Sequence, residues 1–196
     1  MKLSILIATT IDRRDMFNNL FIEFNTQIAL LNLRNQVEVI YIEDNKQMSI
    51  GNKRNELLKL ASGEWIVFFD SDDKPNKKYV ELIYNAVINN EDIDCIGINV
   101  NMTTNGSNPQ KCCHRFKYPE WKTNFDGWDY VRNITHFNPV KKDKALQTGF
   151  KDLRFGEDKD YSDRLYPLLT KEFYIEEPLF DYLYTNKQSH NQKYGI

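Results

Sequence analysis

The chain has 196 residues, of which 41% are hydrophobic and 28% charged, and its formal net charge is −2. This composition is typical of a globular protein, and the near balance of interspersed charges excludes binding to nucleic acid by net charge alone. The three cysteines include one adjacent pair and form no disulfide framework, which favours a reducing compartment. No apolar run approaches the roughly 20 residues that span a bilayer, so we expect no transmembrane segment.

The first hundred residues alternate predicted strands and helices. Apolar runs predict four buried strands, over residues 3–8, 37–42, 65–69 and 94–100. Apolar residues at three- and four-residue spacing predict helices between them, over about 14–33, 47–61 and 75–90, with Pro75 in a first turn. Because such strand–helix–strand units form right-handed parallel crossovers, we expect a Rossmann-like α/β arrangement.

The second half of the chain is less regular. Residues 101–109 are polar and contain a glycine, which predicts a loop, and residues 115–128 are expected to form a strand and turn over the site. Further elements are predicted from apolar spacing: a short helix over 128–134, a helix that begins near Tyr161, and short strands over 171–175 and 180–184.

Three carboxylates, Asp70, Asp72 and Asp73, follow the apolar strand 65–69 within four positions. Because an unpaired ionised carboxylate is costly to bury, these groups must emerge at the carboxyl end of the strand. That edge is where open α/β sheets bind ligands, and hard oxygen ligands suit Mg²⁺ or Mn²⁺. A solvated acidic turn, with Asp73 or Asn76 capping the next helix, is the alternative that the local sequence leaves open.

An ordered set of segments carries a resemblance to a known family. The segments are Leu3–Thr10, Glu43-Asp44, Gly51–Asn55, Gly63–Asp73 and, later, Gly156-Glu157-Asp158 with Arg164-Leu165. Together they resemble the family 2 glycosyltransferases of the GT-A fold, over roughly residues 1–190. The resemblance implies an α/β, Rossmann-like nucleotide-diphospho-sugar transferase fold, whose mostly parallel central sheet is flanked by helices.

The resemblance also implies one domain over residues 1–196 that uses a nucleotide-sugar donor. Residues 1–100 would bind the donor, while residues 101–196 would bind the acceptor and carry the catalytic base. The family's processive members have a Gln-x-x-Arg-Trp motif and transmembrane helices, and this sequence has neither. We therefore expect the transfer of one hexosyl or pentosyl group at a time.

Five residues are expected at the nucleotide. Thr9 and Arg13 match the family's nucleoside-contacting positions, and Asp44 matches the acidic residue that accepts a hydrogen bond from uracil N3–H, which favours a UDP-sugar. A cap of a helix or turn is the alternative role of Asp44. Lys53 and Arg54 lie near a predicted helix start, where cations do not favour the helix dipole, so a nearby anion is expected. Plain surface charge is their alternative role.

The family's metal motif falls on Asp70–Asp73. The resemblance implies that Asp72 is the main ligand of Mn²⁺ or Mg²⁺, that Asp73 shares the metal, and that Asp70 contacts the ribose or base side. The sequence does not divide these roles further. His190 matches a late position over the diphosphate, where it would ligate the metal or bind a phosphate oxygen. A merely exposed side chain is the alternative for this histidine.

The catalytic base is expected at the start of the helix near Tyr161. Asp158 matches the family's base, which takes the proton of the acceptor hydroxyl during an inverting, in-line attack. Glu157 would orient the acceptor or support Asp158, and Asp160 is the rival base. An acidic first turn that serves only the helix dipole is the alternative.

The acceptor is left open by the sequence, as is the oligomeric state. A saccharide of a surface glycan or a lipid-linked oligosaccharide is favoured, in the cytoplasm of a bacterium or of a phage-infected host, with peripheral membrane association left open. A nucleotidyltransferase is disfavoured because no glycine-rich loop follows the first strand. An inactive binding module with the GT-A fold is a further alternative.

A phage-type enzyme that glycosylates modified DNA bases is the remaining alternative, and it is not favoured. The aromatic residues Trp121, Phe125 and Trp128 would then stack on a flipped base, although covering the core is their preferred role. This alternative also requires one basic face beside the site. The cations that would have to form it are Arg115, Lys117, Lys122, Arg132, Lys141, Lys142 and Lys144.

Overall fold

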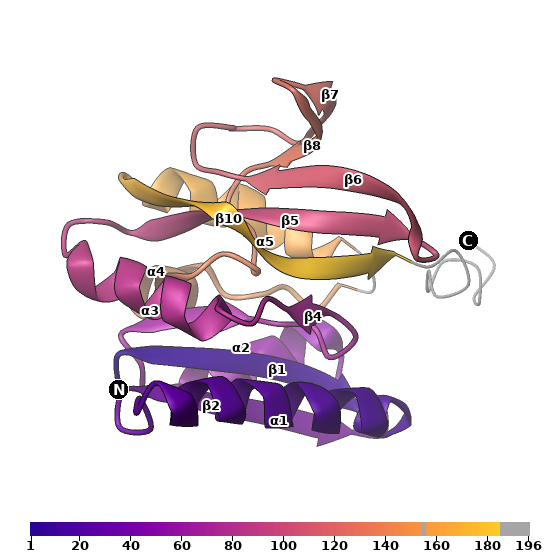
Figure 1. The fold of residues 1–196 in the computed structure, drawn as a ribbon, viewed down its shortest axis with the longest axis vertical. Helices are drawn as coiled ribbons and strands as arrows, with labels where there is room; N and C mark the ends of the chain where they lie inside the picture. Colours follow the sequence, from indigo (N-terminus) through magenta and orange to yellow (C-terminus); the bar gives the residue numbers. More distant parts are fainter. Residues whose placement is uncertain (154–155, 185–196) are drawn as a thin grey trace.

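The computed structural model describes residues 1–153 and 156–184. Its parallel core consists of β1 (Leu3–Thr10), β2 (Val37–Asp44) and β3 (Trp65–Phe68) (Figure 1). In this core β1 lies between β2 and β3. A 3-10 turn over Ile11–Arg13 and α1 (Arg14–Leu30) link β1 to β2, and α2 (Ile50–Leu60) links β2 to β3. The strands and crossovers predicted for this part of the chain are thereby confirmed.

The sheet continues into the second half of the chain. The strand order is β2-β1-β3-β9-β5-β6-β8-β7, and β10 (Glu172–Tyr184) pairs in parallel with β5 and antiparallel with the short β4 (Lys74–Pro75). The other strands are β5 (Cys95–Thr104), β6 (Ser107–His114), β7 (Lys122–Phe125), β8 (Trp128–Arg132) and β9 (Val140–Lys141). The described fold is therefore α/β, with a mixed, mostly parallel central sheet flanked by helices.

Helices cover both faces of the sheet. On one face, α1 and α3 (Tyr79–Asn89) pack together (Figure 1). On the other face, α2 contacts α4 (Lys142–Thr148), which in turn contacts α5 (Glu157–Leu165); a 3-10 turn over Tyr166–Leu168 follows α5. None of the helices among the described residues is long and apolar enough to cross a membrane.

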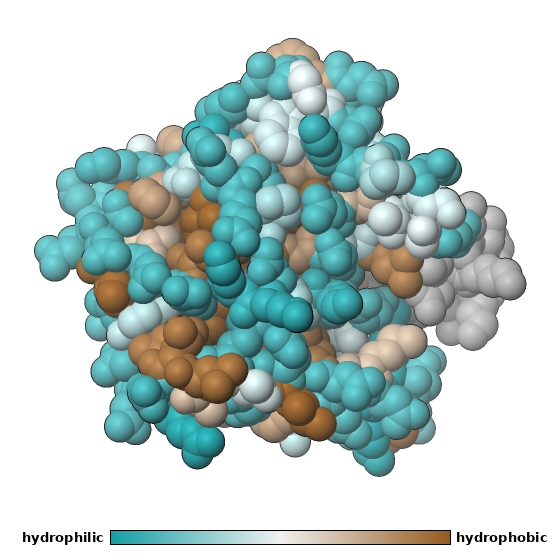
Figure 2. All heavy atoms as spheres, in the orientation of Figure 1, coloured by the Kyte–Doolittle hydropathy of each residue, from teal (hydrophilic) through white to brown (hydrophobic). Residues whose placement is uncertain are grey.

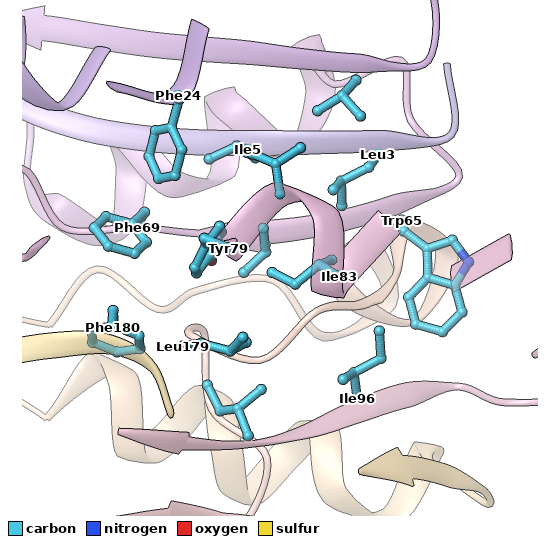
Figure 3. Close-up of a cluster of buried hydrophobic side chains, with 14 of the residues drawn as sticks. Leu3, Ile5, Phe24, Trp65, Phe69, Tyr79, Ile83, Ile96, Leu179 and Phe180 are labelled. Atoms are coloured by element: carbon cyan, nitrogen blue, oxygen red, sulfur yellow. The ribbon is translucent and has the colours of Figure 1, made fainter. Parts of the chain in front are cut away.

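The two faces of the sheet bury separate apolar clusters. Figure 3 shows the cluster beneath α1 and α3, where Phe24, Phe69 and Tyr79 meet. The rings of Phe24 and Phe69 lie 5.1 Å apart, edge to face. On the opposite face, Phe68 packs beneath α2 and α5 in the second cluster. Because neighbouring residues of β3 serve opposite faces, the strand is buried on both sides, as its unbroken apolar run predicts.

The outer surface of the helices is more mixed than the core. Figure 2 shows a face that is mostly polar, with apolar side chains gathered over α1 and α3. Ile22 and Leu30 on α1 are among the exposed apolar residues.

Ser49 caps the start of α2, where its side chain accepts a hydrogen bond from the Asn52 amide at 3.2 Å. Ser49 is therefore the N-cap of this helix.

The structure corrects two predictions in the region that follows β5. The segment 101–109 is not a loop, because β5 continues to Thr104 and turns directly into β6. The turn residues Asn105 and Gly106 both have positive φ, which is the geometry of a two-residue hairpin turn. The segment 128–134 is not a helix either, because β8 pairs with both β6 and β7.

Two further corrections concern β4 and β10. Pro75 does not begin a helix: it lies in β4, opposite Phe180 of β10, and α3 begins only at Tyr79. The two short strands predicted over 171–175 and 180–184 form the single strand β10. Register shifts around Pro178 explain why the sequence pattern breaks there, since proline cannot donate to a strand ladder.

The buried histidine of β6 makes the stability of the fold depend on pH. The His114 ring contacts the Thr135 hydroxyl at 3.0 Å, and burial, reinforced by Arg132 and His136, lowers its pKa from 6.5 to about 3. The folded state therefore binds a proton less readily than the unfolded state. The contribution of neutral His114 to the free energy of unfolding is fully present above pH 6.5. It is lost as the pH falls toward 3, by up to about 1.4 kcal/mol per pH unit.

We expect His114→Asn to flatten this dependence, because asparagine does not titrate and its amide reaches the position of the ring Nδ1. Urea unfolding at pH 7.5 and pH 5.5 checks this for the wild type and the variant. The wild type should lose more stability than the variant between the two pH values. Equal losses would mean that His114 is protonated in the folded protein.

Candidate active site

The acidic end of β3 and the start of α5 are joined by one buried arginine. Arg54 of α2 lies with its guanidinium 3.3 Å from Asp70 Oδ1 and 3.1 Å from Glu157 Oε1. The rings of Phe68 and Phe150 lie 5.9 and 5.3 Å from the same guanidinium. Two acidic segments that are far apart in the sequence therefore meet at one edge of the sheet, through a charge that is itself removed from solvent.

A second buried cation joins the ends of β1 and β2. Lys53 donates from Nζ to the Thr9 carbonyl at 2.8 Å and forms an ion pair with Asp44. Asp44 also accepts from the amides of Lys46 and Met48, at 3.1 and 2.7 Å. Burial alone would raise the pKa of Asp44, but Lys53 and these amides outweigh it and lower the pKa. An anion was expected near Lys53 and Arg54. The anion at Lys53 is Asp44, and the anions at Arg54 are Asp70 and Glu157.

The three carboxylates after β3 have different surroundings. Asp70 is held by Arg54, and its other oxygen lies 4.0 Å from His136 Nε2. Asp72 forms an ion pair with Arg13 at 3.1 Å. Asp73 is buried, and its Oδ2 atom has no hydrogen-bond partner among the described residues.

These surroundings move the three pKa values in different directions. Burial would raise the pKa of Asp70, but His136 and the Arg54 guanidinium more than offset it and hold this pKa well below its ordinary value. Burial and the Asp70 charge raise the pKa of Asp72, against the effect of Arg13. For Asp73, burial and the charges of Asp70 and Asp72 raise the pKa strongly. In the absence of a further cation, ionisation of all three carboxylates together is therefore unfavourable.

A divalent cation would favour the ionised form of these carboxylates, although the described residues do not assemble a complete ligand set. Over residues 1–153 and 156–184, no three His, Cys, Asp or Glu side chains form a group that could hold a metal ion. The fit rests on the unpartnered oxygen of Asp73 and on the mutual repulsion of the three carboxylates. His190 lies outside the described residues, so its role stays a prediction, as does the division of roles among the three aspartates.

Polar atoms that have no hydrogen-bond partner in the described part of the chain gather around this edge. They belong to buried side chains near the ends of β1 and β3: the hydroxyls of Thr9, Ser71 and Tyr79, one Asp73 oxygen, and both ring nitrogens of His136. Buried polar atoms in native proteins almost always have partners, which include ligands and ordered water. The concentration of such atoms beside the three carboxylates indicates a site that binds a polar ligand.

The start of α5 distinguishes the candidate base from its rival. Asp160 forms ion pairs with Lys151 at 2.6 Å and with Arg164 at 2.5 Å. Burial would raise the pKa of Asp160, but these two partners lower it. Asp158 accepts a hydrogen bond from the Lys159 amide at 2.7 Å and has no ion pair within the described part of the chain. Among the acidic residues of this turn, Asp158 is thus the one that forms no ion pair with any described residue.

Two residues near the site were missed by the sequence analysis. His136 lies between β8 and β9, where a single histidine in a connecting segment gives no periodic signal. Burial raises the pKa of the Tyr182 phenol in β10, and the nearby charges of Asp73, Asp70, Asp72 and Asp158 raise it further. The alternating pattern of β10 could have indicated an inward side chain at Tyr182, but not which carboxylates it would meet.

An aromatic groove lies beside α5. Its volume is about 500 Å³, and it is lined by Trp121, Lys122, Thr123, Phe125 and Arg132. The Trp121 indole donates to the Asn133 side chain at 2.7 Å, and Ser162 of α5 donates to the same Asn133 oxygen. The hairpin of β7 and β8 is thereby attached to the helix that carries Asp158.

The cations that a DNA-binding face would need are dispersed. Arg115 is paired with Glu172 at 2.9 Å, and Lys117 with Asp126 at 2.7 Å. Lys141 and Lys142 lie at β9 and the start of α4, which β5 and β6 separate from β8 in the strand order. Lys141 and Lys142 are therefore separated by two strands from the cation of β8, Arg132.

Comparisons with known proteins agree with the fold described above. Residues 25–148, well over half of the chain, match the family described as Glycosyl transferase family 2. No curated protein matches the chain by sequence. Among solved structures, Staphylococcus aureus TarS 1–349 is 20% identical, over 93% of this chain and 60% of that one, with a TM-score of 0.63.

The complex of S. aureus TarS 1–349 with UDP-GlcNAc is 17% identical to the chain, over all of this chain and 62% of that one, with a TM-score of 0.64. The chain thus spans about 60% of the length of these TarS structures, and at this identity the likeness concerns the fold alone. The family match, the α/β sheet and the TarS likeness agree with one another: the chain belongs to glycosyltransferase family 2 and has the GT-A fold.

Proposed function

We propose that the chain transfers one hexosyl or pentosyl group from a nucleotide-diphosphate sugar to an acceptor hydroxyl, with inversion at the anomeric carbon. The observation that carries this proposal is the Arg54 bridge, which joins Asp70 at the end of β3 to Glu157 at the start of α5. A transferase needs a donor site and a base on opposite sides of one sugar carbon. TarS 1–349, which has a similar fold, forms a complex with UDP-GlcNAc, and this supports a UDP-sugar as the donor.

We assign donor binding to residues 1–100. The buried Thr9 hydroxyl has no partner in the described structure and can bind the nucleoside. Arg13, half-exposed beside Asp72, brings positive charge to the edge where a diphosphate would lie. Asp44 would accept from a base with an imino donor, in addition to its contacts with Lys53 and the backbone. Lys53 and Arg54 act by holding Asp44 and Asp70 in place.

The carboxylates of Asp72 and Asp73 would hold Mn²⁺ or Mg²⁺, and His190 stays a predicted further ligand. The supporting observation is the buried Asp73 Oδ2 atom, which has no hydrogen-bond partner among the described residues. A cation bound there supplies Lewis-acid stabilisation of the charge that develops on the departing diphosphate.

Asp158 is the proposed base, which takes the proton of the acceptor hydroxyl. The commitment of the rival Asp160 to two cations supports this assignment. Glu157 fixes the first turn of the helix through Arg54. Residues 101–196 would bind the acceptor, for which a surface or lipid-linked saccharide is favoured. The groove at Trp121 and Phe125 supports a sugar, because aromatic rings offer apolar faces for stacking.

Thermal unfolding with UDP, dTDP, GDP, CDP and ADP, each with and without Mn²⁺, tests the donor site. A ligand that binds only the native state adds about 2.7 kcal/mol of stability at 100 times its dissociation constant. We expect a rise in melting temperature with UDP that requires Mn²⁺ and disappears in Asp72→Ala. Asp92→Ala, which removes a fully exposed carboxylate elsewhere, serves as the matched control and should retain the shift. If none of the nucleotides stabilises the wild type, the chain is a GT-A fold without donor chemistry.

A further inference from the structure

His136 lies beside the end of β3, although it belongs to the connection between β8 and β9. The Phe68 amide donates to the His136 carbonyl at 3.1 Å. Residues two apart in an extended segment face the same side, so Phe68 and Asp70 do so. Because His136 is a cross-strand neighbour of Phe68, it is a diagonal neighbour of Asp70. The side chains meet accordingly, with His136 Nε2 4.0 Å from Asp70 Oδ2.

The connection around His136 is fixed by hydrogen bonds. Asn138 accepts from the Thr135 amide at 2.9 Å and donates to the Ile96 carbonyl at 2.8 Å. The imidazole packs on the Phe137 ring, with 3.9 Å between the ring centres. The histidine is thus held against the carboxylate by backbone and ring contacts that do not involve its own nitrogens.

Those nitrogens are the unexplained feature. The His136 side chain is 4% exposed, and neither of its nitrogens has a hydrogen-bond partner in the described structure. A separation of 4.0 Å is about 1 Å longer than a hydrogen bond. In the absence of substrate, hydrogen bonds of active sites are often long and tighten when the ligand binds. In the described structure, Asp70 is the carboxylate that faces this ring, 4.0 Å from Nε2.

We propose that His136 is a positioning residue of the donor site, which donates from Nε2 to Asp70 Oδ2 when the nucleotide sugar is bound. Arg54 holds the first oxygen of Asp70 from α2, and His136 holds the second from the β8–β9 connection. The carboxylate then has one fixed orientation toward the hydroxyl groups of the donor nucleoside. The inference rests on the proposed function and adds a residue to it.

Calorimetric titration with UDP in the presence of Mn²⁺ tests the inference on three replacements of His136. His136→Gln places an amide nitrogen near the position of Nε2, His136→Asn places one near Nδ1, and His136→Phe has neither. We expect the Phe and Asn variants to bind UDP about tenfold more weakly, or about 1.4 kcal/mol, as for the loss of one hydrogen bond to a charged group. The Gln variant should stay within about threefold of the wild type.

A double-mutant cycle with Asp70→Asn shows whether His136 acts through Asp70. We expect His136→Phe to have no further effect on UDP affinity once Asp70 is replaced, because the interaction is then already lost. Equal affinity of all three variants and the wild type would overturn the inference, and so would additive losses in the Asp70→Asn background. If the Phe variant does not fold, the comparison of Gln with Asn decides the question. A wild type that binds no nucleotide overturns the proposed function itself.

Discussion

Replacing Asp158 with asparagine is expected to lower the rate of sugar transfer by about 10²- to 10⁴-fold, while UDP binding stays unchanged. The amide keeps the shape of the side chain and cannot take the proton of the acceptor hydroxyl. The described structure gives the Asp158 carboxylate no cation that would occupy it, so the replacement breaks no ion pair. Initial rates with a UDP-sugar and an acceptor that the wild type uses, together with UDP affinity, check both parts of the expectation.

Asp160→Asn is the matched control, two positions along the same turn of α5. It disrupts the ion pairs with Lys151 and Arg164, so we expect a loss of stability and only a small change in rate. The assignment of the base would be wrong if the Asp160 variant lost transfer activity while remaining folded and the Asp158 variant retained it. Loss of UDP affinity in Asp158→Asn would instead give this residue a role in donor binding.

Replacing Arg54 with methionine is expected to destabilise the fold by about 3–5 kcal/mol. Removing one partner of a buried ion pair leaves the remaining charges uncompensated, and here two carboxylates, Asp70 and Glu157, lose the same cation. Methionine retains most of the apolar contact with the rings of Phe68 and Phe150. Urea unfolding monitored by circular dichroism measures the change in the free energy of unfolding.

A matched surface arginine separates burial from simple loss of charge. Arg14 pairs with Glu43 at 2.5 Å, but more than half of its side chain is exposed. Exposed ion pairs contribute little to stability, so Arg14→Met should leave the unfolding curve nearly unchanged. A change for Arg54→Met as small as that for Arg14→Met would show that the bridge between the acidic segments does not stabilise the folded protein.

The parallel core could be predicted from the sequence because its signals are local. The unbroken apolar run at 65–69 is typical of a strand that is buried on both faces. Because an ionised carboxylate is costly to bury, Asp70 must lie where that strand leaves the core. The apolar spacing along α1 and the cap at Ser49 are equally local. These elements follow from residues that are close together in the sequence.

The second half of the chain was predicted less well, because pairing with partner strands determines its structure more than local propensity does. Residues 128–132 become a strand because β6 and β7 lie on both sides of them, and neither neighbour is visible in the local pattern. The turns at Asn105-Gly106 and Asp126-Gly127 were the available hairpin signals. His136 could not be found from the sequence, because its contact with Asp70 depends on how the β8–β9 connection runs along β3.

The central claim is that one edge of the sheet binds a divalent cation together with a nucleotide diphosphate, and spin resonance of Mn²⁺ tests it most directly. Free Mn²⁺ gives a strong signal that disappears on binding. We predict that the wild type with UDP removes about one equivalent of this signal, that Asp72→Ala with UDP removes no more than UDP alone, and that Asp92→Ala behaves as the wild type. Uptake that is absent in the wild type, or equal in Asp72→Ala, would contradict the account.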